Sequence, residues 1–268
     1  VEVEFVVVKP MELNKIRHTI AVMSGKGGVG KSLVSSLIAV ALRRRGYDVG
    51  ILDADITGPS IPRMFGISEP PGGNDDGILP VLARSGIGIM SINLLLPGED
   101  EAVIWRGPFI GKAIRQFGES VLWGKLDFLI VDLPPGTADA PLTVLQSFQV
   151  SGVVIVFTPQ DLTKMIVKKA VNMARKMEKQ VLGVVENMSY LTCPKCGERI
   201  EVFGPSQAMR TANQLGVPML AQLPLDPDLA RRCDAGEVEL YGNDLFDALA
   251  TKVMERLPET KSVPIFGK

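Results

Sequence analysis

The chain has 268 residues, of which 46% are hydrophobic and 22% are charged, and its formal net charge at pH 7 is −1. This composition allows a large buried core, and the near-zero charge argues against a general attraction to nucleic acid or anionic membranes. Because no apolar stretch is long enough to cross a bilayer and the N-terminus lacks the charge pattern of a signal peptide, we expect a cytoplasmic protein.

The first predicted elements surround a glycine-rich loop. Residues 18–23 are a short apolar run typical of a buried strand, and apolar side chains recur at helical spacing over residues 33–41. Strand, loop and helix in this order favour phosphate binding, because loop amides and the helix N-terminus then face the same anion. The loop residues are Gly25, Lys26, Gly27, Gly28, Val29, Gly30, Lys31 and Ser32, and Leu33 follows them.

Two lysines distinguish this loop from the ordinary phosphate-binding loop, G-x-x-x-x-G-K-[ST]. In that pattern the last lysine reaches the β- and γ-phosphates and the next hydroxyl ligates Mg²⁺, so we predict these roles for Lys31 and Ser32. Lys26 is an additional cation for which a single subunit has no obvious use. We therefore expect it to contact a phosphate held elsewhere.

Four more apolar runs, at residues 49–52, 128–131, 153–157 and 181–185, are continuous rather than alternating. Such runs are typical of strands buried on both faces, and helical patterns separate them. We predict a three-layer α/β fold whose mostly parallel sheet is covered by helices on both faces, with ligands at the carboxyl ends of the strands.

Two segments between these runs have a distinct composition. Residues 69–86, rich in Pro, Gly and Asp, are expected to form a mobile surface excursion. Residues 161–179 form a predicted helix with Met165 on its apolar side and several lysines on the other. The basic side is expected to be a solvated helix face, and a DNA-contacting surface is the alternative.

Carboxylates follow two of the predicted strands, where phosphoryl transfer needs a metal shell and a group that orients water. We assign Asp132 to the Mg²⁺ shell through water, Asp53 to support of that shell, and Asp55 to orientation of the attacking water. Gly136 lies in a segment whose backbone could sense the γ-phosphate. For each single aspartate, a helix cap or a turn is the alternative role.

Three cysteines are too few for a disulfide framework, and Cys193 and Cys196 have the spacing of a metal knuckle. Two thiolates are half of the four that a tetrahedral metal or a cubane cluster requires, so a second chain would supply the others. Either Zn²⁺ or an iron–sulfur cluster fits, and uncommitted thiols in a turn are the alternative. We expect Cys233 to be a packing residue and His18, the only histidine, to be structural.

The two-lysine loop, the paired aspartates and the segment from Asp132 to Gly136 resemble the deviant Walker A ATPases, the P-loop group that includes MinD, ParA and the nitrogenase iron protein. This resemblance implies that Lys26 reaches the nucleotide of the opposite subunit and that ATP is enclosed in a dimer. Catalytic residues would then be Lys26, Lys31, Asp55 and Asp132.

Narrower motifs over about residues 17–257 resemble the Mrp (ApbC-type) ATPases, which carry iron–sulfur clusters and deliver them to apoproteins. These motifs are Trp105-Arg106-Gly107-Pro108, Glu186-Asn187-Met188-Ser189-Tyr190, Cys193-Pro194-Lys195-Cys196-Gly197-Glu198, Pro224-Leu225-Asp226-Pro227 and Asp234-Ala235-Gly236. The resemblance implies that Asn187 recognises adenine and that Pro224, Leu225 and Asp226 line the base pocket. It leaves the role of Arg106 open.

Together these features predict a slow Mg²⁺-dependent ATPase and a homodimer that carries a labile [4Fe–4S] cluster at its axis to apoproteins. The predicted organisation is an N-terminal extension (1–16), one ATPase domain (17–260) with a metal-knuckle insertion near 190–202, and a tail (261–268). Two alternatives remain: a ParA- or MinD-like positioning ATPase, and a structural zinc protein that binds ATP. The near-zero net charge argues against a nucleic-acid partner. A membrane partner is not expected either, since prolines at 258 and 264 interrupt the C-terminal segment where an amphipathic membrane helix would lie.

Overall fold

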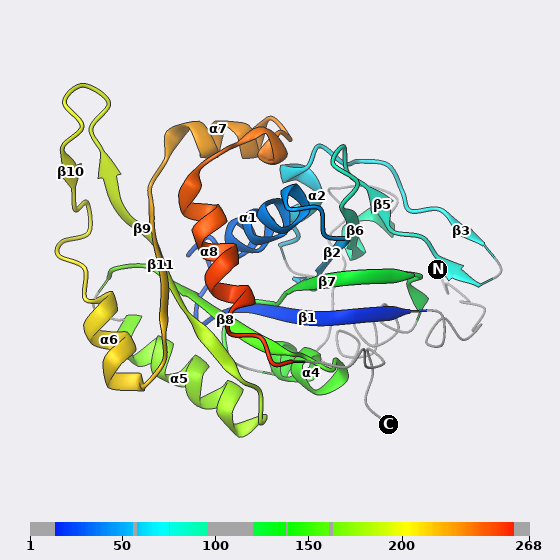
Figure 1. Cartoon of the computed structure of the whole chain (residues 1–268), viewed down its shortest axis with the longest axis horizontal. Coiled ribbons are helices and arrows are strands. Elements are labelled where there is room, and N and C mark those ends of the chain that lie inside the picture. Colours follow the sequence, from blue (N-terminus) through cyan, green and yellow to red (C-terminus); the bar gives the residue numbers. More distant parts are fainter. Residues whose placement is uncertain are drawn as a thin grey trace.

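The computed structural model describes residues 14–55, 58–74, 76–95, 120–137, 139–160 and 163–259. Within these residues a nine-stranded sheet forms the centre of the molecule (Figure 1). Its strands are β1 (Lys15–Ser24), β2 (Val49–Asp53), β5 (Val81–Leu82), β6 (Gly88–Ser91), β7 (Lys125–Asp132), β8 (Gly152–Phe157), β9 (Val181–Thr192), β10 (Arg199–Ile200) and β11 (Met219–Pro224).

The strand order is β10-β9-β8-β1-β7-β2-β6-β5, and β11 also pairs with β9. All pairs are parallel except β5 with β6 and β10 with β9. β1 therefore lies between β7 and β8, and the loops that follow β1, β2 and β7 leave the sheet at the same edge. Ligands collect at this edge in doubly wound sheets.

Helices cover both faces of the sheet (Figure 1). One face carries α1 (Lys31–Arg44), α2 (Ile61–Met64), α7 (Pro227–Asp234) and α8 (Asp244–Met254), and the other carries α4 (Asp139–Ser147), α5 (Thr163–Lys176) and α6 (Ala208–Leu215). Because successive strand residues point to opposite faces, β1 contributes Ile20 and Val22 to the α1 side and Ala21 and Met23 to the α5 side. The predicted three-layer α/β architecture is confirmed.

The segment at residues 69–86 contains short strands that the sequence did not indicate. It contains the hairpin of β3 (Gly73–Asn74) and β4 (Gly77–Ile78), and β5 then extends the central sheet. The strand β6 was missed, because four residues that begin with glycine carry no recognisable strand pattern. Short 3-10 turns follow at Ile92–Leu95 and Val238–Leu240.

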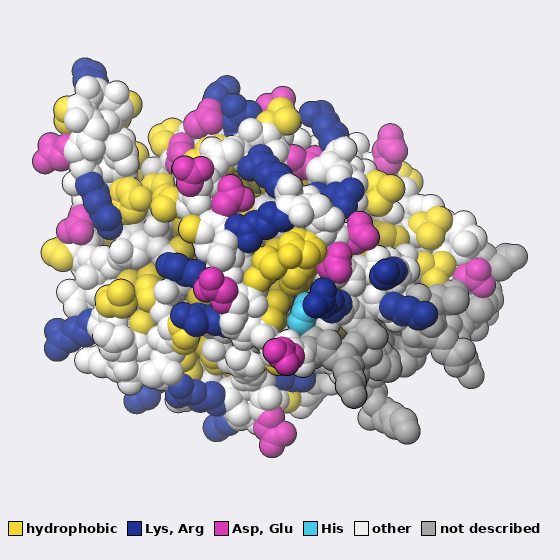
Figure 2. All heavy atoms as spheres, viewed as in Figure 1, with side chains coloured by type: hydrophobic (Ala, Val, Ile, Leu, Met, Phe, Trp, Pro, Cys, Tyr) yellow, Lys and Arg dark blue, Asp and Glu magenta, His cyan; other side chains and the backbone are white. Residues whose placement is uncertain are grey.

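The α5 helix agrees in place with the prediction, but Met165 is 58% exposed instead of lying on the buried side. Lys168, Lys169 and Lys176 are exposed, as expected for a solvated face. Figure 2 shows Lys and Arg side chains along the lower left edge, over α5 and α6.

The two remaining structural predictions concern single side chains. His18 is buried and stacks on Phe128 with 5.5 Å between ring centroids, and burial lowers its pKa. Cys233 is half-buried and packs against the core on the α1 side, where burial raises its pKa to about 11. Both are packing residues, as predicted.

The ends of the chain are described in part. β1 already begins at Lys15, while residues 1–13 of the predicted extension and the predicted tail at 261–268 lie outside the described residues. No helix in the described part is long and apolar enough to span a membrane.

Candidate functional site

The phosphate loop joins the end of β1 to the start of α1. Gly30 caps α1 with a φ of 80°, in the left-handed region that glycine tolerates, and it has no side chain that could accept from the first helical N–H groups. Those amides remain free for an anion, and the helix dipole favours negative charge there. Backbone and helix therefore have the arrangement that the predicted phosphate site requires, and phosphate binding at these residues stays a prediction.

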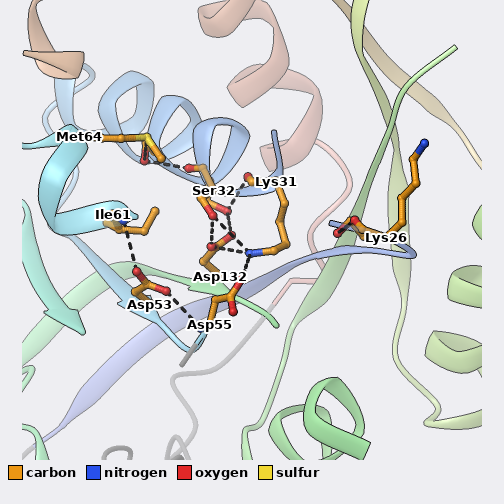
Figure 3. Close-up of polar contacts among 11 residues, drawn as sticks. Lys26, Lys31, Ser32, Asp53, Asp55, Ile61, Met64 and Asp132 are labelled. Atoms are coloured by element: carbon orange, nitrogen blue, oxygen red, sulfur yellow. Dashed lines mark hydrogen bonds and ion pairs between the residues drawn. The ribbon is translucent and has the colours of Figure 1, made fainter. Parts of the chain in front are cut away.

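Lys31, Ser32 and Asp132 meet at this helix start (Figure 3). Asp132, the last residue of β7, accepts hydrogen bonds from Lys31 Nζ and Ser32 Oγ, each at 2.6 Å. Lys31 and Asp132 are almost completely buried, with 5% and 0% of their side chains exposed. The oxygens of Ser32 and Asp132 form a donor set that suits Mg²⁺, a hard cation that prefers oxygen ligands.

Ser35 is a member of this cluster that sequence reasoning missed. Its hydroxyl donates to the second oxygen of Asp132 at 2.6 Å and to the Lys31 carbonyl at 3.1 Å. Ser35 lies four residues after Lys31, one turn along α1, so helical spacing from the phosphate lysine was the signal that could have identified it.

Asp53 is the last residue of β2, the strand next to β7, and Asp55 lies two residues beyond it. Asp53 accepts from the backbone N–H groups of Asp55 at 3.1 Å and Ile61 at 3.2 Å, so its carboxylate bridges the two ends of the loop that leads into α2. Burial, followed by the nearby charge of Asp132, raises the pKa of Asp53 to about 8. Asp55 lies 3.8 Å from Lys31 Nζ. The Mg²⁺ role of Asp53 and the water-orienting role of Asp55 stay predictions.

Lys26 is separate from this cluster. Its ammonium donates to Gln160 Oε1, and the side chain extends away from Lys31 (Figure 3). Gly136 donates its N–H to the Ser24 carbonyl at 3.0 Å, which places the segment after β7 against the start of the phosphate loop.

The residues assigned to the base pocket come from β9 and from the junction of β11 and α7. Asn187 is buried, and its Nδ2 donates to the Val29 carbonyl at 3.0 Å. Asp226 caps α7, because its Oδ1 accepts from Asp228 N at 2.8 Å and its Oδ2 accepts from the Tyr241 hydroxyl. These contacts give Asp226 a structural use, and its adenine role stays a prediction.

Pro224 and Leu225 continue this junction. Pro224 ends β11 opposite Tyr190 of β9, and Leu225 donates its N–H to the Tyr190 carbonyl at 2.7 Å. Leu225 is 37% exposed, so part of its apolar side chain is accessible. Pro224, Leu225 and Asp226 thus lie together at the end of β11, while Asn187 lies within β9, and their role in a base pocket stays a prediction.

The cysteine knuckle forms the tip of the β9–β10 hairpin, which projects from the sheet in Figure 1. Cys193 N donates to the Glu198 carbonyl at 2.8 Å and Gly197 N donates to the Cys193 carbonyl at 2.9 Å, so the turn is closed by backbone bonds. Hydrogen bonds from the backbone N–H groups of Cys196 and Lys195 lower the pKa of the Cys193 thiol. This favours the thiolate, which is the form that binds metals.

Two further points concern the metal ligands and the motif that contains Arg106. Within the described residues, no group of three or more His, Cys, Asp or Glu side chains could hold a metal ion. The motif at residues 105–108, with Arg106, lies outside the described residues.

Comparison with known proteins agrees with this geometry. The family described as ParA, NUBPL iron-transfer P-loop NTPase, matches residues 15–257. An iron–sulfur cluster carrier protein of Clostridium perfringens is 46% identical over 234 residues, which cover 84% of this chain and 82% of that protein.

Two solved structures extend the comparison to the fold. A nucleotide-binding protein of Archaeoglobus fulgidus in complex with ADP, with cobalt found in it, is 47% identical over 87% of this chain and 91% of that chain, with a TM-score of 0.77. The cell division ATPase MinD of Pyrococcus furiosus is 22% identical, covers 89% of this chain and 99% of that chain, and shares the fold with a TM-score of 0.65. The chain therefore belongs to the ParA family of P-loop NTPases, in the NUBPL iron-transfer group.

Proposed function

We propose that this chain is an ATP-hydrolysing, cytoplasmic homodimer that binds a labile [4Fe–4S] cluster at its two-fold axis and transfers the cluster to apoproteins. The cysteine pair at the hairpin tip carries this proposal. Cys196 is exposed and Cys193 is half-buried, so both thiols are accessible to a cluster. Two thiolates complete only half of a four-ligand centre, and two hairpins that face each other supply all four.

The ATPase chemistry is assigned to the cluster at the start of α1. Lys31 would contact the β- and γ-phosphates, Ser32 would ligate Mg²⁺, and Asp132 would hold the ion through water, with Asp53 as support. Magnesium neutralises phosphate charge when it is bound, and Asp55 orients the attacking water. Binding of Mg·ATP has to displace the contacts that Asp132 makes with Lys31 and Ser32 at 2.6 Å, because the phosphates and the metal require the same groups.

Dimerisation explains the second lysine of the loop. Lys26 extends away from the Lys31 cluster, so it is free to reach a phosphate across a subunit interface once its contact with Gln160 is exchanged. Both the nucleotide site and the cysteine site are then completed by the same association. Asn187, Pro224, Leu225 and Asp226 hold the adenine end of the nucleotide.

The iron–sulfur name of relatives such as the Clostridium perfringens carrier favours a cluster at the cysteines. Zn²⁺ binds the same kind of soft sulfur site and can occupy it in aerobically purified protein. Anaerobic reconstitution is therefore required for any test of the cargo.

The decisive experiment compares cluster transfer by three proteins reconstituted anaerobically: the wild type, Cys196→Ala and the matched control Cys233→Ala. We expect the wild type and the control to bind iron and sulfide and to activate an apoprotein, and Cys196→Ala to do neither. Equal transfer by Cys196→Ala and the wild type would refute the carrier role.

A second experiment separates the carrier from the alternatives. ATP hydrolysis is expected to disappear in Lys31→Ala and Asp55→Ala, which would exclude an ATP-binding structural zinc protein. Co-sedimentation with liposomes or DNA that depends on ATP would instead favour a ParA- or MinD-like positioning ATPase.

A further inference from the structure

Residues 186–189 of β9 lie between the phosphate loop and the cysteine hairpin. Before them, β9 pairs with β8 inside the sheet, and beyond them its end pairs with β10 to form the hairpin. Tyr190, the next residue, still pairs with Pro224 of β11, so a displacement that starts at the phosphate loop has to pass through these four residues and this pairing to reach the hairpin.

Asn187 connects this joint to the phosphate loop. Its buried Nδ2 donates to the Val29 carbonyl at 3.0 Å, and a Cβ atom added to Gly30 would lie only 2.1 Å from the same nitrogen. Contacts this close leave no free space, so a change in the loop on nucleotide binding has to move Asn187 or break its hydrogen bond.

Glu186 connects the joint to both legs of the hairpin, on the opposite face of β9. Its Oε2 accepts from the Ser189 hydroxyl at 2.6 Å, the Ser206 hydroxyl at 2.6 Å and Gln222 Nε2 at 2.9 Å. Ser189 lies on the strand that enters the hairpin, and Ser206 lies on the segment that returns from it to α6. One carboxylate oxygen thus holds both legs against β11.

Met188 lies between these anchors with a φ of 54°, a left-handed conformation that costs a non-glycine residue roughly 1 kcal/mol or more. In a regular strand, residues 186 and 189 would point to opposite faces. The reversal at Met188 brings the Ser189 hydroxyl to Glu186, so the backbone strain and the hydrogen-bond network depend on each other.

The network also has an unused acceptor. Glu186 is fully buried at 0% exposure, yet its Oε1 has no hydrogen-bond partner among the described residues. A serine hydroxyl can therefore exchange Oε2 for Oε1 without leaving the buried carboxylate short of donors. The two arrangements place the corresponding hairpin leg differently, which is the kind of two-state element that coupling between sites requires.

We infer that Glu186 is a positioning residue that couples nucleotide occupancy of the phosphate loop to the placement of the cysteine hairpin, through Asn187 on one side and Ser189 and Ser206 on the other. This inference rests on the proposed function, in which the hairpin holds the cargo and the phosphate loop binds ATP. Glu186 itself touches neither the nucleotide nor the cysteines.

The test measures the alkylation rate of Cys196 by mass spectrometry in cluster-free protein, with and without a Mg²⁺-bound non-hydrolysable ATP analogue. For the wild type we expect the two rates to differ by at least about fivefold, the lower end of typical coupling between two sites. Glu186→Gln should reduce this ratio to near one while it still binds the analogue. The matched control Glu201→Gln changes an exposed carboxylate on the segment that returns from the hairpin, and it should keep the wild-type ratio.

A wild-type ratio in Glu186→Gln, or a ratio of one in the wild type, would overturn the inference. If Glu186→Gln does not fold, Ser206→Ala provides the same test, because it removes one donor and leaves the buried charge with the others; a wild-type ratio there would also overturn it. Cluster uptake is measured separately on the same proteins. Absence of uptake with an intact ratio would contradict the carrier role and leave the coupling established.

Discussion

Replacement of Lys31 by Met is expected to destabilise the nucleotide-free protein strongly, because it removes the cation from a buried ion pair. Lys31 Nζ and Asp132 Oδ2 are 2.6 Å apart, with 5% and 0% of the two side chains exposed. Breaking a buried pair by removal of one partner costs about 3–5 kcal/mol, since the other charge stays buried. Asp132 keeps the hydroxyls of Ser32 and Ser35, so we expect about 3 kcal/mol.

The pair is measured most cleanly by a double-mutant cycle with Lys31→Met, Asp132→Asn and the double variant. Free energies of unfolding come from urea denaturation followed by tryptophan fluorescence, without nucleotide. The double variant contains neither charge. Its loss of unfolding free energy should therefore be smaller than the sum of the losses in the two single variants, by about 2–3 kcal/mol. A matched cycle on Arg43 and Asp48, a pair at 3.2 Å with side chains 31% and 63% exposed, should give less than about 1 kcal/mol.

Additivity at the buried site within about 0.5 kcal/mol would refute the reasoning, because independent residues behave in that way. The same cycle at saturating Mg·ATP should give a smaller coupling energy, since bound phosphate and metal replace the direct contact between the two side chains.

Three other predictions follow from the packing. Gly236→Ala should lower the free energy of unfolding, measured by thermal denaturation, by about 1–3 kcal/mol, because the added Cβ would lie 2.5 Å from the Cα of Gly66 and the residue has a φ of 71°. The control Gly242→Ala should be tolerated, because no atom lies nearer than 3.9 Å to its added Cβ. Burial lowers the pKa of His18 below 6.5, so the unfolded chain takes up a proton before the folded chain does, and the free energy of unfolding falls as the pH drops below about 6.5. His18→Gln should reduce this pH dependence, measured by denaturation at a series of pH values. Burial raises the pKa of Cys233 to about 11, so at about pH 8 its alkylation should be slower than that of the hairpin cysteines and should accelerate toward pH 11. Equal alkylation rates at about pH 8 would contradict this prediction.

The phosphate site could be predicted from the sequence because its parts are close together along the chain. The glycine loop, Lys31 and Ser32 are consecutive, and the apolar runs on either side fix their place at a strand end. Asp132 could be added because parallel strands bring their carboxyl ends to one edge of the sheet.

The contacts that set side-chain direction could not be predicted in the same way. Asp53 is directed to backbone amides because the chain folds back at Ile61, and a sequence pattern contains no information about that path. The network of Glu186, Ser206 and Gln222 joins residues up to 36 positions apart. Glu186 belongs to a recognised motif, whereas Ser206 and Gln222 belong to none. The pairing of β9 with β11 brings Gln222 to Glu186, and the return of the chain from the hairpin brings Ser206 to them.

The left-handed turn at Met188 also has a mechanical consequence. From that residue to Cys193 the strand extends about 17 Å, since each residue adds roughly 3.3 Å. Once the contacts of Tyr190 with Pro224 and Leu225 open, a rotation of about 10° at Met188 would move the sulfur atoms sideways by about 3 Å over that length. A change of one torsion angle beside the phosphate loop would thus give a movement longer than a metal–sulfur bond. Such a movement is large enough to change how tightly the cysteines bind a cluster.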